Sequence, residues 1–213
     1  EIPTWKIALL GRLSAVLPDE KAALIELNLS VAGFLNPEKQ SLKIDASLYD
    51  SRIVMWTVSG DMAMRSNWGD EPRFLLSVGG WNPRYDPPED FPELRPVKAS
   101  LGAPGGNPRI EFTGYFAVTS NTVQAGAGVH AVAKAGPAKI EGKLAFDALL
   151  QFNPFKFIVD FNASLSVKIK GKGLSIRVDG TLSGPGPFRI KGTLHIEILF
   201  FDITVNADVT IGP

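Results

Sequence analysis

Apolar and polar residues alternate along most of this chain, and the longest regular run spans residues 156–169. In that run Phe157 and Phe161 fall on one side, while Asp160 and Lys168 fall on the other. Because successive side chains of a β-strand point to opposite faces of a sheet, this period of two predicts a strand with one apolar face. The strand would hold about thirteen residues, where five or six are usual.

The same alternation predicts nine further strands, separated by short turns rich in glycine, proline and asparagine. The expected ranges are 5–17, 23–35, 42–48, 54–64, 74–81, 140–152, 174–182, 188–200 and 201–211. Short turns join antiparallel neighbours. The sequence therefore predicts an all-β fold, a long-stranded antiparallel meander of about ten strands with one apolar and one polar face.

A glycine with apolar residues two positions away on both sides recurs seven times, always on the apolar side of its run. These glycines are Gly11, Gly33, Gly60, Gly114, Gly142, Gly180 and Gly192. Glycine within a strand costs about 0.5–1 kcal/mol relative to alanine, so the shared position indicates a shared purpose. We expect a strongly curved sheet, either an open barrel, a folded-over sandwich or a groove. Side chains added at Gly142 or Gly192 would then crowd the concave face.

One long irregular stretch, residues 82–108, interrupts the alternation and is rich in proline. Loops of more than about 12–15 residues are usually functional or disordered. We expect residues 1–213 to form a single β domain, a fragment of a larger protein, with this proline-rich loop as its one long insertion.

Composition excludes several classes of function. The 22 basic and 22 acidic residues cancel and are scattered along the polar faces, which argues against a nucleic-acid partner. There is no cysteine, so disulfides and thiolate chemistry are absent, and two histidines without further ligands at metal-site spacing favour no metal site. No apolar run approaches the roughly 18 residues of a transmembrane helix. These features suit a cytoplasmic or an exported protein equally.

Candidate catalytic residues are few. His130 and His195 fall on polar faces, where a solvated position is the simpler interpretation. Carboxylates such as Asp147 could meet across strands and form the acid/base pair of a carbohydrate-active enzyme, but a polar sheet face normally carries such groups. We expect no catalytic residue and no cofactor, and the chain is interpreted as not an enzyme.

The apolar face is the stronger candidate for function. A large curved sheet can leave a groove that an acyl chain or another apolar ligand fills. The expected groove residues are Phe157, Phe161, Leu165, Val167, Phe188, Ile190, Leu194, Ile196 and Ile198. Alternatively, the face is the core of a sandwich, or a contact with a neighbouring repeat. An outer-membrane-type barrel would instead turn this face outward.

Several short motifs between residues 74 and 213 resemble an uncharacterised domain family of large, β-rich bacterial proteins. They are Ser77–Pro83, Pro87-Pro88, Phe91-Pro92, Gly114–Gln124, Gly142–Leu149, Phe152–Phe155 and Leu182–Pro185. The resemblance implies a bacterial source and a larger parent chain, and it implies no reaction.

The leading hypothesis is a non-enzymatic module that binds a hydrophobic ligand or lipid. The alternative is a structural or assembly module whose apolar face meets neighbouring repeats or domains of a larger chain. The unpaired edges of such a sheet would also allow self-association.

Overall fold

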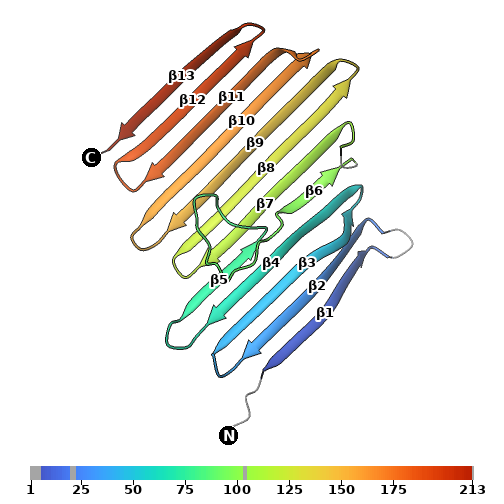
Figure 1. Ribbon diagram of the computed structural model, residues 1–213, viewed down its shortest axis with the longest axis vertical. Coiled ribbons are helices and arrows are strands. Elements are labelled where there is room, and N and C mark those ends of the chain that lie inside the picture. Colours follow the sequence, from blue (N-terminus) through green and yellow to red (C-terminus); the bar gives the residue numbers. More distant parts are fainter. Residues whose placement is uncertain (1–5, 20–22, 103–104, 213) are drawn as a thin grey trace. The chain divides into compact units, whose positions relative to one another are not determined.

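The computed structural model describes residues 6–19, 23–102 and 105–212, and it shows thirteen β-strands (Figure 1). They are β1 (Ile7–Leu17), β2 (Ile25–Asn36), β3 (Ser41–Ile53), β4 (Trp56–Asn67), β5 (Arg73–Val78), β6 (Val97–Leu101), β7 (Arg109–Thr119), β8 (Thr122–Ala135), β9 (Ala138–Gln151), β10 (Lys156–Ile169), β11 (Lys172–Gly184), β12 (Phe188–Ile198) and β13 (Phe201–Ile211). One sheet has the hydrogen-bonded order β1-β2-β3-β4-β5-β7-β8-β9-β10-β11-β12-β13, with β6 paired to β4 and β7. The predicted all-β antiparallel meander is confirmed.

The chain divides into two compact units. Unit 1 contains the described residues up to Ala99 together with Gly114–Gln124, and unit 2 contains Ser100–Thr113 and the described residues from Ala125 onward. Strands β1 to β5 thus belong to unit 1 and strands β9 to β13 to unit 2.

The register of unit 2 places like residues opposite one another. Phe161 on β10 faces Phe146 on β9 and Gly180 on β11, and Gly180 in turn faces Gly192 on β12. Because directly paired residues project to the same side of a sheet, this register gathers the apolar positions of five strands on one face. The expected run 188–200 ends at Ile198, and the chain turns at Leu199, which has φ 52°.

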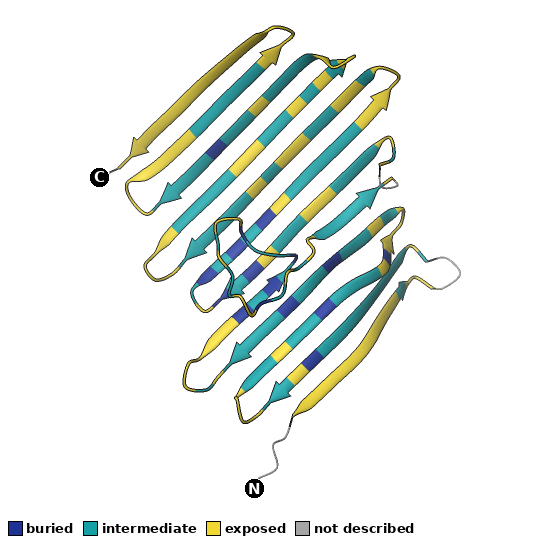
Figure 2. Cartoon of the chain, in the orientation of Figure 1, coloured by how far each residue is buried: buried dark blue, intermediate teal, exposed yellow. Residues whose placement is uncertain are grey.

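The apolar face of unit 2 lies open. Large side chains from the first and the last of its meander strands remain about half exposed, with Leu144 at 58% and Ile203 at 53% (Figure 2). Fully apolar side chains in a two-layered domain are mostly buried. Unit 2 is therefore a single layer whose apolar side is in contact with solvent.

Unit 1 has a small core on the polar side of its own sheet. Ala63 and Leu75 are buried together with Phe91, and Trp81 and Leu94 pack against them. Arg65 faces Leu75 in the register, and Ala63 faces Ser77, so this side carries the polar residues of β4 and β5. The irregular segment after β5 thus covers the polar face and leaves the apolar one open.

The expected loop over residues 82–108 is interrupted by a strand. Strand β6 begins at Val97, whose Cα would lie 2.8 Å from a Cβ added at Gly60. Only glycine, with φ 151°, allows the two backbones to approach so closely. Backbone pairing, rather than composition, determines where this segment becomes regular.

The glycines on the apolar side do not crowd a concave face as expected. A Cβ added at Gly142 or Gly192 would meet only a backbone oxygen, at 4.0 and 3.7 Å, which is ordinary contact. Gly180 is different, because the ring of Phe161 lies directly over it and would overlap an added Cβ. An aromatic ring laid across a glycine on the neighbouring strand covers backbone that would otherwise be exposed.

We therefore predict opposite effects for two alanine substitutions. Gly180→Ala should lower the free energy of unfolding by about 1–2 kcal/mol, because the Phe161 ring must leave its place. Gly142→Ala should raise it by about 0.5–1 kcal/mol, because the site is open and alanine restricts the unfolded chain. Urea titration of both variants measures the difference, and equal effects would contradict the role given to Phe161.

Candidate apolar binding face

The nine residues predicted to line a groove lie on one face of β10 and β12 in unit 2, with β11 between them. Six of them are 39–48% exposed: Val167, Ile190, Phe161, Ile198, Phe188 and Leu165. Phe157, Leu194 and Ile196 are partly buried. The structure brings these residues together through cross-strand pairs, such as Leu165 with Ile176 and Ile176 with Ile196.

The same face continues over three more strands that the predicted set left out. It includes Leu144 and Phe146 on β9, Val178 on β11, and Ile203 and Val205 on β13, all matched in register with the predicted residues. The predicted set followed the two most regular runs of alternation. Counting residues across the intervening turns would have found the others, since short hairpins determine the register.

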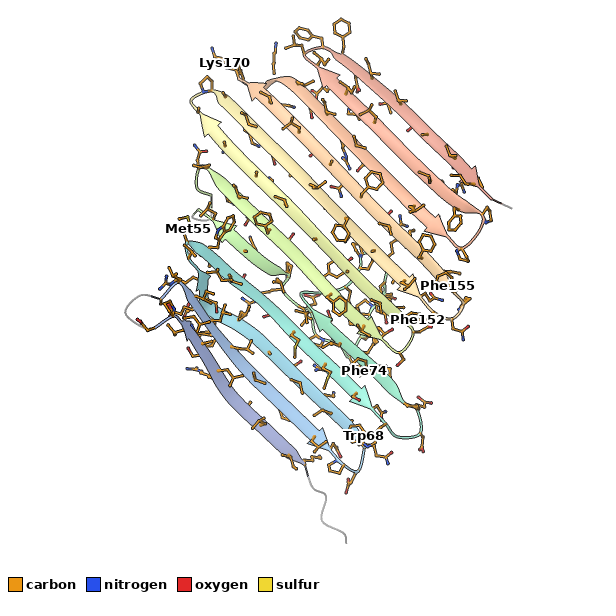
Figure 3. The ribbon with its side chains drawn as sticks, turned by 180° about the vertical axis from the view of Figure 1, so that it is seen from behind. Met55, Trp68, Phe74, Phe152, Phe155 and Lys170 are labelled. Carbon is orange, nitrogen blue, oxygen red and sulfur yellow. The ribbon has the colours of Figure 1, made fainter. Side chains whose placement is uncertain are left out.

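An aromatic cluster occupies one end of this face. The rings of Phe157 and Phe188 have centroids 6.0 Å apart, and those of Phe155 and Phe157 are 6.5 Å apart. Figure 3 shows Phe152 and Phe155 beside the turn that joins β9 and β10. Aromatic side chains present large apolar surface with little conformational freedom, which suits contact with an apolar ligand.

The opposite face of unit 2 is hollowed and polar. A concavity of about 480 Å³ is lined mainly by polar side chains of β10 to β13, including Asp160, Asp179, Lys191 and Asn206. Asp160 accepts a hydrogen bond from the Thr181 hydroxyl at 2.5 Å. The predicted apolar residues therefore form an open face, and this hollow belongs to the other side of the sheet.

Both histidines have partners on polar faces. His130 Nε2 lies 2.8 Å from Glu141 Oε1, and Lys139 donates to Oε2 of the same carboxylate at 2.5 Å. Lys139 first, and then His130, lower the pKa of Glu141 to about 2. His195 Nδ1 lies 3.0 Å from the Thr204 hydroxyl. No group of three metal-ligating side chains occurs among residues 6–19, 23–102 and 105–212.

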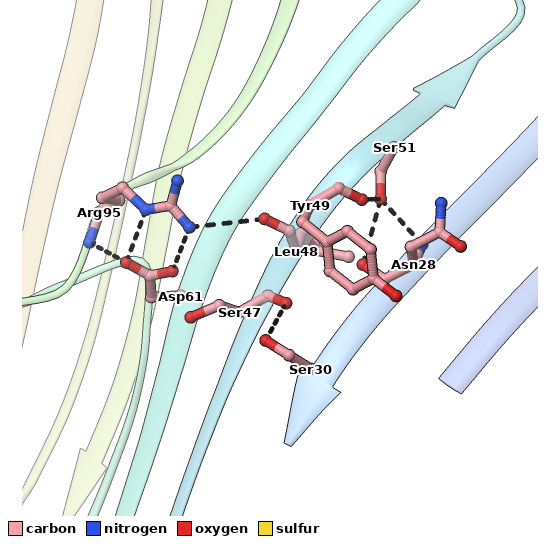
Figure 4. Close-up of polar contacts among 8 residues, drawn as sticks. All are labelled: Asn28, Ser30, Ser47, Leu48, Tyr49, Ser51, Asp61 and Arg95. Atoms are coloured by element: carbon pink, nitrogen blue, oxygen red, sulfur yellow. Dashed lines mark hydrogen bonds and ion pairs between the residues drawn. The ribbon is translucent and has the colours of Figure 1, made fainter. Parts of the chain in front are cut away.

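An ion pair fixes the irregular segment of unit 1 to its sheet (Figure 4). The backbone N–H and Nε of Arg95 donate to Asp61 Oδ2, both at 2.9 Å, and Nη2 donates to Oδ1 at 2.7 Å. These bonds lower the pKa of Asp61 to about 2, although partial burial opposes the shift. Nearby, the Ser51 hydroxyl accepts the N–H of Asn28 at 2.9 Å where the register of β2 and β3 shifts.

A buried polar group holds the start of the same segment. Gln124 Oε1 accepts the N–H of Asn82 at 3.0 Å, and Gln124 Nε2 donates to the Thr122 hydroxyl at 3.0 Å. Asn82 Oδ1 accepts the N–H of Arg84, which is a turn-forming contact. Sequence analysis assigned no role to the fully buried Gln124, which lies outside the ten predicted strands and appeared only at the end of the motif Gly114–Gln124.

Fold and site together define an all-β module in which the apolar face of unit 2 is uncovered. A model of a family of unknown function, DUF6603, matches residues 1–213, and the chain belongs to this family. The match extends the expected resemblance, which began at Phe74, over the N-terminal strands as well. No curated protein and no solved structure matches the chain. Among the described residues, no helix has the length and hydropathy required to cross a membrane.

We predict that the Asp61–Arg95 pair stabilises unit 1 in a pH-dependent way. A carboxyl whose folded pKa is lowered contributes stability above its unfolded pKa near 4 and loses it as pH falls toward 2. Asp61 is 14% exposed, so the contribution near neutral pH is about 2 kcal/mol. Asp61→Asn should lower the free energy of unfolding by up to that amount at pH 6, and the loss should shrink below pH 3.

Asp90→Asn is the matched control. Asp90 also pairs with an arginine, Arg73, but both side chains are about half exposed, so its loss should cost less than about 0.5 kcal/mol. A pH-independent difference between wild type and Asp61→Asn would refute the ionic interpretation.

Proposed function

We propose that this chain is a non-enzymatic β module that binds an apolar ligand, such as the acyl chain of a lipid, on the open face of unit 2. The observation that carries the proposal is the exposure of that face. Six of its large apolar residues are 39–48% exposed although they belong to regular strands of the sheet. Soluble proteins rarely leave a contiguous apolar patch larger than a few hundred Å² without a binding role.

The surface area of the chain supports a missing partner. Its accessible surface is 13,957 Å² for a mass of 23.0 kDa. A folded protein of this mass exposes about 9,600 Å², and two separate domains of half the mass would together expose about 11,600 Å². The accessible surface of the chain exceeds the larger figure by roughly 2,400 Å². That is the area expected when one side of a sheet lacks its covering layer.

The chemistry of the face fits an acyl chain. From β9 to β13 its residues are apolar or glycine, and the one charged residue among their described ladder partners is Lys172, at the turn that begins β11. Five strands span about 20 Å across four inter-strand spacings. Rings that lie flat, as Phe161 does over Gly180, keep the surface low enough for a chain to contact several strands at once.

A second candidate is a structural role in which another domain covers the face. This reading is favoured by unit 1, whose apolar side is also open, with Leu9 65% and Leu13 63% exposed. A second sheet packed about 10 Å from either face would bury that face without any small ligand. The two candidates differ in what should be found on the purified chain.

We predict that the purified chain carries lipid that native mass spectrometry detects and organic extraction removes. Leu165→Asp should abolish this binding, since it places a charge in the middle of the face, where an acyl chain would leave the charge unpaired. Stability of the lipid-free protein should change by less than about 1 kcal/mol, because Leu165 is already half exposed.

Ser164→Asp provides the control on the opposite face of the same strand. Its neighbours in the register are Lys143 and Arg177, so the added carboxylate is compensated and lipid should stay bound. Lipid-free wild-type protein that also fails to take up added palmitate would exclude the ligand proposal and favour the structural role.

A further inference from the structure

The apolar face of unit 2 has two unlike ends. Phe155, Phe157 and Phe188 gather at one end, with ring centroids 6.5 and 6.0 Å apart. The other end is formed by the hairpin turn between β10 and β11, which carries Lys170 and Lys172. Figure 3 shows Lys170 and Phe155 at opposite ends of β10. The face is thus aromatic at one end and positively charged at the other.

Lys172 belongs to the apolar side of the sheet. It pairs with Ile169, the last residue of the apolar series on β10. Its Nζ lies 5.0 Å from the centroid of the Phe200 ring, a distance at which an aromatic face attracts an ammonium group. This contact holds one positive charge at the rim of an otherwise apolar surface.

No acidic side chain neutralises the charge at this rim. Lys168, on the polar side of the same end, pairs with Glu197 at 3.6 Å. By contrast, within the part of the chain that the structure describes, Lys170 and Lys172 form no ion pair. An apolar surface with an uncompensated positive charge at one end is complementary to an anionic group attached to an apolar chain.

The donors available on the face indicate the kind of anion. From β9 to β13, the described ladder positions on the apolar side hold no arginine, serine or threonine. Phosphate groups are usually held by several donors at once, often from an arginine that binds two oxygens. Lys172 supplies a single point charge, which suits a carboxylate with one negative charge.

The ladder beside Lys172 has the length that an acyl chain requires. Half of a bilayer core of about 30 Å gives roughly 15 Å for one chain. A strand rises about 3.3 Å per residue, so such a chain covers four or five residues of β11. Beyond Lys172, Leu174 and Ile176 occupy that distance on the apolar side, and Leu165 and Ile196 flank Ile176 in the register.

We propose that the ligand of unit 2 is a long-chain fatty acid whose carboxylate pairs with Lys172 and whose tail lies along β11 toward Ile176. This inference rests on the proposed function, because it assigns the chemical class of the ligand on the same face. Lys170 adds to the positive potential at the rim, where the carboxylate would arrive.

Calorimetric titration of the lipid-free protein at pH 8 and low salt tests the charge of the ligand. The probes are dodecanoate, dodecyltrimethylammonium and dodecyl phosphate, which share one tail. Dodecanoate should bind about tenfold more tightly than the ammonium probe, because attraction to the lysines replaces repulsion. Sodium chloride at about 0.5 M should bring this ratio close to one. Dodecyl phosphate that binds more than about tenfold more tightly than dodecanoate would overturn the carboxylate assignment.

Charge variants at the two ends of the face test the position of the carboxylate. Lys172→Glu should reverse the preference, and Lys172→Gln should bring the affinities for dodecanoate and the ammonium probe close together. Lys156→Glu is the matched control, since it makes the same change in net charge at the far end of β10 and should keep the wild-type preference. Both lysines are exposed, so the unfolding transitions should stay close to that of the wild type.

The titrations separate failure of this proposal from failure of the proposed function. If the wild type binds dodecanoate and the ammonium probe equally, the fatty-acid assignment is wrong, while binding of apolar ligands on the face stands. If none of the three probes binds, both proposals are wrong. A preference for dodecanoate that survives in Lys172→Glu would also overturn the proposal, because the carboxylate would then lie elsewhere.

Discussion

The ladder of backbone hydrogen bonds is the interaction on which every other feature of this protein depends. In unit 2 the strands have no second layer against which to pack, so their order comes from hairpin pairing and from contacts between side chains on neighbouring strands. Each such pair contributes about 0.2–1 kcal/mol, which makes the register a cumulative property of five long strands. The covering of Gly180 by Phe161 shows how one strand protects the backbone of the next where no core exists to do so. A lipid or a second sheet on the apolar side would supply the burial that the single layer lacks.

Unit 1 shows what happens when the chain provides a cover of its own. Phe91 and Trp81 pack edge to face, with ring centroids 4.9 Å apart, against the polar side of β4 and β5. The segment that carries them is tied down by Arg95 on Asp61 and by Gln124 on Asn82. The segment is thus held mostly by hydrogen bonds and an ion pair. It packs on the polar side of the sheet because Ala63 and Leu75 form a small apolar surface there. The apolar side gains nothing from this segment, so its exposure is a feature of both units.

Period-two alternation predicted most strands well, because the side-chain pattern and the backbone geometry have the same period. The start of β10 at Lys156 follows directly from a break in that pattern, whereas the predicted strand 188–200 ran past the turn at Leu199. Alternation could not reveal β6, which is regular only because Val97 approaches Gly60, and it could not reveal Gln124 as a buried bridge. Both depend on residues far apart in sequence. The apolar face was predicted by the alternation, but whether anything covers it depends on a further layer, and the residue pattern of a single strand carries no information about that layer.

The open face and the backbone ladder of unit 2 contribute differently to any complex that it forms. An exposed apolar face alone would drive association that lacks a defined geometry, since hydrophobic contact has no direction. Backbone pairing between strands has a defined direction and register, and in unit 2 it places the apolar residues of five strands side by side. An apolar ligand would therefore meet a surface whose residue pattern is determined before it binds, although the hydrophobic contact itself has no direction.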